Sequence, residues 1–410
     1  MMNAPGNIHA ALNDLEYRDG VLLWGNRKVT DITAELGTTP FYAYDRNRMA
    51  ARVAELRKAM PADLHLHYAM KANPMPEVVN YIVGLVDGLD VASAGELRVA
   101  LASAVKPMDV SFAGPGKRDP ELRAAIEAGI TINMESETEM RRIERIGAAL
   151  GKRPSVAIRV NPPFELKTAG MKMGGRPSQF GVDAERVPGM LAELGSLDLG
   201  FRGFHVFSGA QNLRSESIEE SINKTVTLII ELAQSTNLEV SFVNLGGGLG
   251  IPYFPKEQAL ALSAVGDAAH RALAGLHKAL GEVEVIMELG RYLVGEAGIY
   301  VTRVIDIKES HGTRFAICDG GLHHHLAASG NFGQVIRKNY PLAAVVQTDE
   351  QQQVSVVGPL CTPLDLLGDR VTLSTLAEGS LVAVLQSGAY GKSASPAAFL
   401  SHPPCAEILV

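Results

Sequence analysis

Short apolar segments alternate with amphipathic, helix-like segments between about residues 40 and 290 of the chain. Eight of the apolar segments have the length and composition of buried strands. They are LHLHYAM (64–70), GLDVAS (88–93), DVSFAG (109–114), TINME (131–135), VAIRV (156–160), GFHVF (203–207), VSFVNL (240–245) and VIMEL (285–289). Strands that alternate with helices indicate a parallel sheet, and eight such units in about 250 residues predict a closed (β/α)8 barrel, or TIM barrel, in the α/β class. An open, doubly wound sheet is the alternative.

Two of the helix-like segments carry a start signal. Ser136 precedes Glu139 by three residues, and Ser217 precedes Glu220 by the same spacing. A serine and a glutamate so spaced can cap the first turn of a helix. We therefore expect helices to begin directly after Ser136 and Ser217.

The pattern changes after residue 290. The segments YLVGEAGIYVTRVIDIKES, TRFAICD, VSVVG and SLVAVLQ have the pattern of strands, and Gly, Pro and polar turns separate them. They predict a mainly antiparallel β-domain. The strand-like segment VLLWGNRKVTDI (21–32) is expected to join it. We place the barrel at residues 38–290 and the β-domain at residues 1–37 and 291–410.

Composition narrows the class of protein. Apolar residues make up 46% of the 410 residues and charged residues 20%, as in globular proteins. The net charge of −7 and the lack of a basic run argue against a nucleic-acid partner. No apolar stretch approaches the ~18–20 residues of a membrane span, and the N-terminus lacks the apolar core of a signal peptide. Cys318, Cys361 and Cys405 lie far apart, so we expect no disulfide framework and a cytoplasmic location.

Several polar residues follow the predicted strands at their carboxyl ends, where barrel enzymes keep their chemistry. Lys71 follows the first strand. Desolvation of a lysine there lowers its pKa and yields a neutral amine for Schiff-base chemistry. The alternative is an ordinary surface lysine. Gly246, Gly247 and Gly248 follow the seventh strand. Their backbone N–H groups can approach a phosphate, or they can form a plain tight turn.

Two further candidates end the sixth and eighth strands. Glu288 in MELGRYLVG offers a carboxylate that can hold a cofactor ring nitrogen protonated, or that can pair with the nearby Arg291. His205 in GFHVFSG can stack on a cofactor ring, or it can be a core histidine.

The run from His323 to His325 invites interpretation as a metal site. Consecutive residues point to different sides of the backbone, so they serve one ion poorly, and we expect no metal. The surrounding glycines suggest a loop near a ligand. They are Gly320, Gly321, Gly330 and Gly333.

The motifs HYAMKAN, DVASAGEL, FAGPGK, GFHVFSG, NLGGGLG, ELGRYLVG, VGPLCTPLD and SGAY occur in this order across nearly the whole chain. Together they resemble the fold-type III pyridoxal-phosphate decarboxylases, the diaminopimelate, ornithine and arginine decarboxylase family. The resemblance implies the two-domain architecture that alanine racemase also has, with a barrel that binds pyridoxal 5'-phosphate and a β-domain.

The resemblance also implies roles in the barrel. Lys71 would bind the cofactor as a Schiff base, His205 would stack on its pyridine ring, and Glu288 would pair with the ring nitrogen. Gly246 to Gly248 would cradle the phosphate. The further cofactor contacts that it implies are Asp90, Ser208, Gly290, Arg291 and Tyr390.

For the β-domain, the resemblance implies a homodimer with shared active sites. Cys361 and Asp365 would reach the other subunit's site, and Cys361 would deliver a proton to the α-carbon after carbon dioxide leaves. It would then complete a catalytic set with Lys71, His205 and Glu288. The substrate contacts implied are Arg291, Arg337, Tyr340, Cys361, Asp365 and Tyr390.

The substrate loop departs from the family pattern. Diaminopimelate decarboxylases usually carry CESGD, whose glutamate contacts the distal amino group, but here the run from Cys361 to Asp365 reads CTPLD. This run and GGLHHHLAASGNFG look more like a side branch, which includes decarboxylases of exosortase-linked polysaccharide clusters and antibiotic-pathway enzymes acting on carrier-protein-bound amino acids. We therefore expect an amino-acid or aminoacyl-carrier-protein substrate, with diaminopimelate in doubt.

Three functions remain to be compared. An α-decarboxylase is the first, and an amino-acid racemase on the same fold is the second. A racemase needs bases on both faces of the α-carbon, and the YGHG run that follows the lysine of alanine racemases is absent here. The third is a non-catalytic relative, against which the intact Lys71 and Cys361 argue. Release of carbon dioxide distinguishes the first function from the others.

Overall fold

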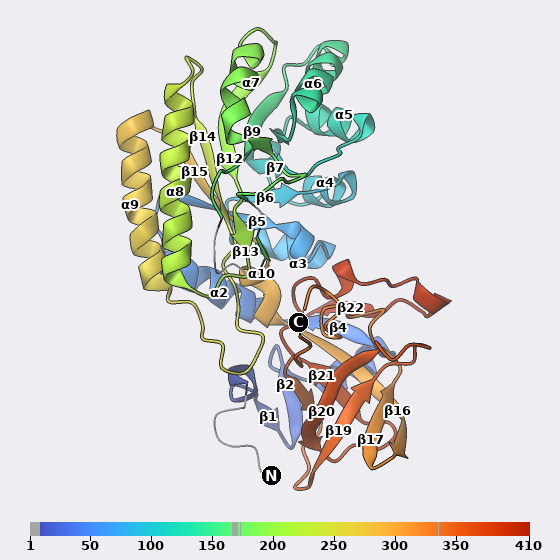
Figure 1. Ribbon diagram of the computed structural model, residues 1–410. Coiled ribbons are helices and arrows are strands. Elements are labelled where there is room, and N and C mark those ends of the chain that lie inside the picture. Colours follow the sequence, from blue (N-terminus) through green and yellow to red (C-terminus); the bar gives the residue numbers. More distant parts are fainter. Residues whose placement is uncertain (1–8, 166–170, 173, 335) are drawn as a thin grey trace. The chain divides into compact units, whose positions relative to one another are not determined.

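The computed structural model describes residues 9–165, 171–172, 174–334 and 336–410, and the chain divides into two compact units (Figure 1). One unit comprises Ala51–Ile251 and Ala259–Tyr292. The other comprises Met1–Ala50, Pro252–Gln258 and Leu293–Val410. The sequence placed the boundaries at residues 38 and 290. The first lies later because strand β4 (Phe41–Tyr44) pairs with β16 of the second unit.

The first unit is a closed parallel barrel, which confirms the predicted fold. Its eight strands are β5 (Leu64–Ala69), β6 (Gly88–Val91), β7 (Val110–Phe112), β8 (Thr131–Met134), β9 (Ser155–Asn161), β12 (Gly200–Val206), β14 (Phe242–Gly247) and β15 (Glu284–Leu289). Each coincides with one predicted segment. They pair in the order β9-β12-β14-β15-β5-β6-β7-β8, and a parallel β8–β9 pairing closes the ring. Their carboxyl ends therefore surround one mouth.

Helices surround the barrel strands, and α8 and α9 lie side by side outside β12, β14 and β15 (Figure 1). The helices are α2 (Arg46–Ala59), α3 (Pro76–Ile82), α4 (Ala94–Leu101), α5 (Asp119–Ala128), α6 (Glu137–Leu150), α7 (Val187–Leu194), α8 (Ser215–Gln234) and α9 (Leu262–Leu280). In α6 the buried residues Met140, Ile143 and Ile146 recur every three positions and face the strands.

The two predicted helix starts have different outcomes. Ser136 is the N-cap of α6, and its hydroxyl accepts the Glu139 N–H, as predicted. The prediction for Ser217 was wrong, because α8 begins at Ser215. Ser217 lies inside the first turn and not at its cap, and its hydroxyl accepts a hydrogen bond from the Asn212 side chain.

The inside of the barrel holds a small apolar cluster of Ala157, Phe242 and Ile286. Strand β12 separates β9 from β14, so a contact between Ala157 and Phe242 crosses the barrel interior. Polar side chains occupy the interior nearer the mouth, as described below.

The second unit is a mainly antiparallel β-domain, as predicted. Its main sheet has the order β18-β21-β16-β17-β19-β20, and β4 joins β16 to β22. The strands other than β4 are β16 (Gly298–Ser310), β17 (Thr313–Cys318), β18 (Leu342–Ala344), β19 (Gln351–Val357), β20 (Leu366–Ser374), β21 (Leu381–Val384) and β22 (Ala406–Leu409). Only β17–β19 and β22–β4 are parallel among these pairs.

The N-terminal segment joins this unit but is only partly strand. Residues 21–24 and 27–28 form β2 (Val21–Trp24) and β3 (Arg27–Lys28), with β1 (Tyr17–Arg18) beside them. The expectation that residues 29–32 continue as strand was wrong, because they begin α1 (Val29–Leu36). Val29 and Ile32 are three positions apart and both enter the core, so helical spacing buries them on one face.

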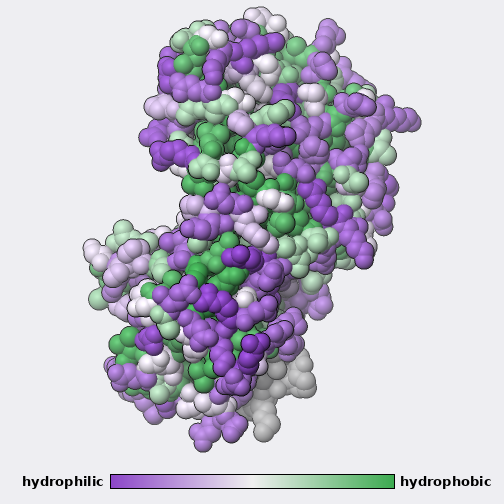
Figure 2. All heavy atoms as spheres, turned by 180° about the vertical axis from the view of Figure 1, so that it is seen from behind, coloured by the Kyte–Doolittle hydropathy of each residue, from purple (hydrophilic) through white to green (hydrophobic). Residues whose placement is uncertain are grey.

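The surface is of mixed polarity. On the face shown in Figure 2, hydrophilic and hydrophobic residues are interspersed. The most exposed large apolar side chains are Ile336, Met108 and Leu364. In the described part of the chain, no helix combines the length and apolarity needed to cross a membrane.

Candidate active site

The predicted cofactor residues of the barrel lie at its mouth. Lys71 is in a single 3-10 turn (Met70–Ala72) directly after β5. Its side chain is exposed, and its Nζ lies 5.5 Å from the centre of the Phe207 ring, which follows β12. The chain thus presents the lysine at the mouth instead of enclosing it.

His205 and Glu288 face each other inside the barrel. His205 Nε2 lies 3.5 Å from Glu288 Oε2, and both residues are buried. Asn244 donates a hydrogen bond of 3.3 Å to the same carboxylate oxygen. Burial alone would raise the pKa of Glu288, but His205, Lys71 and Arg159 outweigh it and hold this pKa well below its usual range. The carboxylate is therefore ionised throughout the physiological range.

The glycine run after β14 has a backbone that only glycine fits well. Gly248 has φ +90°, where side chains are strained. A Cβ on Gly247 would lie 1.9 Å from the Glu288 carbonyl oxygen. The three glycines line a small pocket together with Ser221 of α8. The Gly246 N–H donates to Asn244 Oδ1 at 2.8 Å, whereas Gly247 and Gly248 are partly exposed. Without side chains, these two glycines allow the close approach that a phosphate requires.

The remaining predicted cofactor residues of this unit are nearby in the fold. Ser208 follows β12, and its Oγ lies 2.6 Å from Ser221 Oγ. Gly290 follows β15, where a Cβ would come within 2.9 Å of the Ala69 carbonyl oxygen of β5. Arg291 begins the short helix α10 (Arg291–Val294). Each lies at the carboxyl end of a barrel strand, as expected.

Asp90 ends β6 inside the barrel and is also buried. Its Oδ1 accepts a short hydrogen bond from the Ser111 hydroxyl of β7, and Asn133 of β8 donates to that hydroxyl at 3.3 Å. Its Oδ2 is buried and has no hydrogen-bond partner among the described residues. One oxygen is thus fixed by the chain, and the other can bind a group from outside it.

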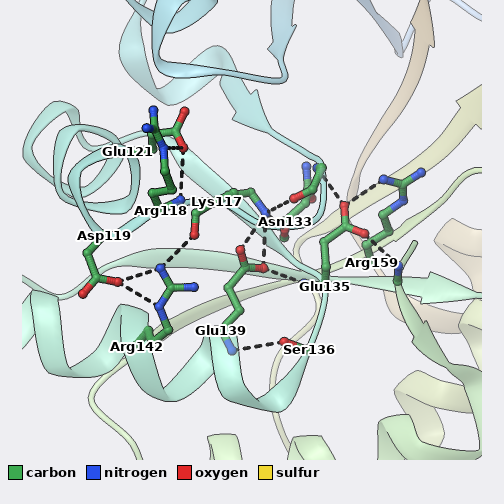
Figure 3. Close-up of polar contacts among 12 residues, drawn as sticks. Lys117, Arg118, Asp119, Glu121, Asn133, Glu135, Ser136, Glu139, Arg142 and Arg159 are labelled. Carbon is green, nitrogen blue, oxygen red and sulfur yellow. Dashed lines mark hydrogen bonds and ion pairs between the residues drawn. The ribbon is translucent and has the colours of Figure 1, made fainter. Parts of the chain in front are cut away.

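The sequence did not predict the buried ion pair between Lys117 and Glu139, which lies after β7 and β8 (Figure 3). Lys117 donates to both Glu139 oxygens at 3.1 and 3.2 Å and to the carbonyl oxygens of Gly114 and Asn133 at 2.8 Å. Burial lowers the pKa of Lys117, and the charges of Glu139 and Glu135 oppose this shift. Both partners had been noted in the sequence but not paired: Lys117 ends the FAGPGK motif, and Glu139 was assigned only to a helix cap.

A second pair in Figure 3 joins three strand ends. Glu135, directly after β8, accepts hydrogen bonds of 2.7 Å from Arg159 of β9 and from the N–H groups of Gly114 and Gly181. Burial would raise the pKa of Glu135, but Arg159 and Lys117 outweigh it, so the net shift is downward. Arg159 is the Cα neighbour of His205 across the β9–β12 pairing. The Glu135–Arg159 ion pair therefore lies next to His205, the histidine predicted to contact the cofactor.

Two of the predicted substrate residues lie in one loop of the β-domain and differ in exposure. Cys361 is an exposed free thiol, whereas Asp365 is buried. Asp365 Oδ1 accepts the Leu322 N–H at 2.5 Å, and its Oδ2 accepts the Leu360 N–H at 2.8 Å. Burial raises the pKa of Asp365, and these hydrogen bonds oppose the shift. Both carboxylate oxygens of Asp365 therefore bind the backbone of its own chain and hold the loop around Cys361 in place.

The other three predicted substrate residues of this unit also contact their own chain. Arg337 donates to the carbonyl oxygens of Ser329 and Leu366 and to the Asn339 side chain. Tyr340 is buried, with its ring centre 4.7 Å from that of Tyr253. Tyr390 has φ +55°, and its ring stacks on Phe332 at 6.3 Å.

The histidine run is buried in the β-domain. His324 Nε2 lies 2.9 Å from the Pro403 carbonyl oxygen, and His325 Nε2 lies 2.8 Å from Ser387 Oγ. Burial lowers the pKa of His325 to about 3, so its ring is neutral. These contacts direct the two rings to different partners.

The barrel residues fit pyridoxal phosphate. Both ring nitrogens of His205 and Asp90 Oδ2 are buried without hydrogen-bond partners among the described residues. An ionised carboxylate, Glu288, stands beside His205, and a glycine cradle follows β14. An amine for covalent attachment, Lys71, completes a set that suits a ring, a phosphate and an aldehyde.

Comparisons with known proteins agree with this chemistry. Residues 46–295 match the family model "Pyridoxal-dependent decarboxylase, pyridoxal binding domain". The chain is 39% identical to the L-glutamyl-[BtrI acyl-carrier protein] decarboxylase of Niallia circulans, over 90% of this chain and 88% of that protein. It is 34% identical to the diaminopimelate decarboxylase of Aquifex aeolicus, over 97% and 92%. The diaminopimelate decarboxylase of M. jannaschii, solved with L-lysine, superposes with a TM-score of 0.89 at 25% identity, over 98% and 94%.

The compared proteins named above are decarboxylases, and the comparisons give the racemase alternative no support over decarboxylation. The substrate is accordingly an amino acid and the cofactor is pyridoxal phosphate. The chain belongs to the fold-type III pyridoxal-phosphate-dependent amino-acid decarboxylases.

Proposed function

We propose that this enzyme removes the α-carboxylate from an amino acid whose side chain is attached to a carrier protein, and that free diaminopimelate is not its preferred substrate. The observation that carries the proposal is the loop Cys361 to Asp365. The family pattern places a glutamate there for a distal ammonium group, and this loop has none.

The geometry of the loop strengthens the argument. Its one carboxylate belongs to Asp365, which is buried and holds two backbone N–H groups of its own chain. Leu364 is 57% exposed and presents an apolar side chain. A charged distal group would lose a charge-assisted contact worth roughly 1.5–3 kcal/mol relative to the glutamate-bearing pattern. An uncharged linkage such as an acyl thioester needs no such partner.

Arg337 supports the same conclusion. A guanidinium group has five N–H donors. In Arg337, three of them already donate to the chain itself: Nε to Ser329, Nη1 to Asn339 and Nη2 to Leu366. The arginine therefore has fewer donors for a distal carboxylate than the family motif suggests. The relative at 39% identity is named for a glutamyl group on an acyl-carrier protein, which is a substrate of the proposed class.

The chemistry follows from the residues of the site. When bound, pyridoxal phosphate supplies an electron sink for the pair left on the α-carbon as carbon dioxide leaves. Glu288 is ionised, and beside the ring nitrogen it would keep that nitrogen protonated and so maintain the sink. Lys71 would attach the cofactor, and His205 would pack against its ring. Exposed Cys361 delivers the proton that replaces the carboxylate on the α-carbon.

We further propose a two-fold dimer with shared sites, in which Cys361 serves the partner's barrel, and a cytoplasmic location. A two-fold interface uses each surface twice, so one chain can supply Lys71 and the other Cys361 to each site. The free thiols of Cys318, Cys361 and Cys405 suit a reducing compartment.

The test measures carbon dioxide release from free diaminopimelate, other free amino acids, and amino acids loaded on a carrier protein. The proposal expects the highest kcat/KM for a carrier-bound substrate. The triple variant T362E/P363S/L364G restores the CESGD pattern, and it should raise kcat/KM for diaminopimelate by about 10–100-fold. A preference of the unmodified enzyme for diaminopimelate contradicts the proposal, as does racemisation without carbon dioxide release.

A further inference from the structure

His67 is a buried histidine that the site described above does not use. It lies in β5, four residues before Lys71, and is 2% exposed. Neither ring nitrogen has a hydrogen-bond partner among the described residues. On one side its register partner is Glu288 of β15, and on the other it is Gly88 of β6. Residues in register on parallel strands share a face, so His67 points inward with Glu288.

Gly88 provides the space that the imidazole occupies. A Cβ at this position would lie 2.5 Å from His67 Nε2 and 2.3 Å from the Asp109 carbonyl oxygen. The ring crosses β6 at this gap and reaches the next inward residue of that strand, Asp90. Its Nδ1 lies 3.6 Å from Asp90 Oδ1. The glycine therefore allows the imidazole to approach Asp90 inside the barrel.

The contact between His67 and Asp90 is one end of a row of polar side chains on four neighbouring strands. Asp90 Oδ1 faces His67 Nδ1 and also accepts from Ser111, to which Asn133 donates. The other oxygen, Oδ2, is buried without a partner among the described residues. Ser111 thus donates to one oxygen of Asp90, and the His67 ring approaches the same oxygen from another strand.

We propose that His67 is a positioning residue of the cofactor site, which holds Asp90 Oδ1 through a proton on Nδ1 and so directs Oδ2 toward the bound cofactor. The charged groups on the strands packed against it are Asp90 of β6 and Glu284 and Glu288 of β15. The inference uses the family's cofactor and does not depend on which amino acid is the substrate.

The same strand offers a matched control. His65 lies two residues before His67 on the same face, at the opposite end of the barrel from the mouth. Its Nδ1 lies 3.3 Å from Glu284 Oε1, and its side chain is 46% exposed. H65Q therefore removes a histidine–carboxylate pair from β5 without touching the cofactor site.

The experiment compares H67F, H67Q and H65Q as holoenzymes and after removal of the cofactor. H67F keeps a flat ring but removes the proton, whereas the H67Q amide can still donate to Asp90. Three readouts are taken: the pH titration of the bound cofactor's visible absorbance, the dissociation constant of pyridoxal phosphate from the apoenzyme, and kcat and KM. Melting temperatures report the stability of each variant.

We expect H67F to shift the absorbance titration and to lower kcat about 10–100-fold, the size of a lost charge-assisted contact, with KM changed much less. H67Q should recover part of both effects, and H65Q should match the unmodified enzyme in both. If His67 acts through Asp90, the double variant H67F/D90N should be no worse than D90N alone.

Two outcomes overturn the inference. The first is an H67F absorbance titration and kcat that match those of H65Q. The second is additive losses in H67F and D90N, which would show that the histidine acts independently of the aspartate. Because the absorbance and cofactor affinity need no substrate, a wrong substrate proposal does not affect the result. If H67F does not fold, H67L, which also lacks a donor, replaces it in the single and double variants.

Discussion

His205 Nε2 lies 3.5 Å from Glu288 Oε2 on the inner face of the barrel, and both side chains are buried. The two residues come from β12 and β15, which are separated by β14. Asn244 of β14 bridges the gap through its hydrogen bond to Glu288. This arrangement places an ionised carboxylate beside the histidine for which we propose ring stacking, and both residues and Asn244 lie on three neighbouring strands.

Replacing Glu288 by glutamine should lower turnover by about 10²–10³-fold, because the ring nitrogen loses the charge that holds its proton. Bound cofactor should remain, since the glycine cradle and Lys71 are intact. The measurement is kcat together with cofactor content. Glu284, at the other end of β15, pairs with Arg202 and His65, so E284Q is the control and should keep turnover within a few-fold. Near-normal turnover of E288Q would refute the assignment.

Glu288 should not limit activity at mildly acidic pH. Its pKa is held well below the usual range, and a carboxyl with a depressed folded pKa stays ionised until the pH falls through that lower value. The stability that its ionisation contributes is therefore present above the ordinary carboxyl pKa and is lost only in strong acid. The pH profile of kcat should consequently show no carboxyl titration that disappears in E288Q between about pH 5 and 8.

Replacing Lys71 by alanine should abolish both activity and the visible absorbance of the lysine-bound cofactor. Borohydride reduction of the unmodified enzyme, followed by peptide mapping, should label Lys71. The exposed lysine Lys106 serves as the control, and K106A should retain colour and activity. Labelling of a different lysine contradicts the assignment.

The strand ends were predictable because each buried strand of a barrel is a short apolar run in the sequence. Lys71 follows one of those runs and Glu288 lies at the end of another, so sequence position alone predicted that both are at one mouth. The contacts inside the barrel were not predictable in this way. Lys117 meets Glu139, and His67 meets Asp90, across separations of 22 and 23 residues that depend on strand register.

Local signals also failed where tertiary contacts outweighed them. Ser217 has the spacing of a helix cap, but Asn212 takes up its hydroxyl oxygen. Asp365 has the family position of a substrate-binding carboxylate, yet Leu322, 43 residues earlier, donates its N–H to it. Motif spacing carries no information about such distant partners.

The Lys117–Glu139 pair gives a prediction about stability. Glu139→Gln leaves a buried ammonium without its counter-charge and should cost about 3–5 kcal/mol of unfolding free energy. Glu137, two residues earlier in α6, pairs with the exposed Arg186, and E137Q should cost no more than about 1 kcal/mol. Urea unfolding measures both. Equal costs would show that burial of the pair has little energetic effect.

The same lysine gives a prediction about pH. Burial lowers the pKa of Lys117 below its ordinary value of 10.5. Between the lowered value and 10.5 the unfolded chain binds more protons at this residue than the folded chain, so unfolding free energy rises with pH there. K117M removes this contribution. The stability difference between the unmodified enzyme and K117M should therefore grow as the pH is raised toward 10.5, and a constant difference would contradict the shift.

The last prediction concerns the shared site. Lys71 lies in the barrel unit and Cys361 in the β-domain unit, and we propose that each site of a two-fold dimer takes one residue from each chain. Inactive K71A and C361A chains are mixed in equal amounts and allowed to exchange. About half of the dimers should be mixed, and in each of these one site carries both changes while the other carries neither.

Activity should then recover to roughly a quarter of the unmodified level, because half of the dimers each contain one intact site of two. The test requires that C361A alone be nearly inactive, and differently tagged chains that co-purify show that exchange has occurred. If Lys71 and Cys361 of one chain served the same site, every site in a mixed dimer would carry one change. Mixed dimers that co-purify but stay inactive would therefore rule out the shared site.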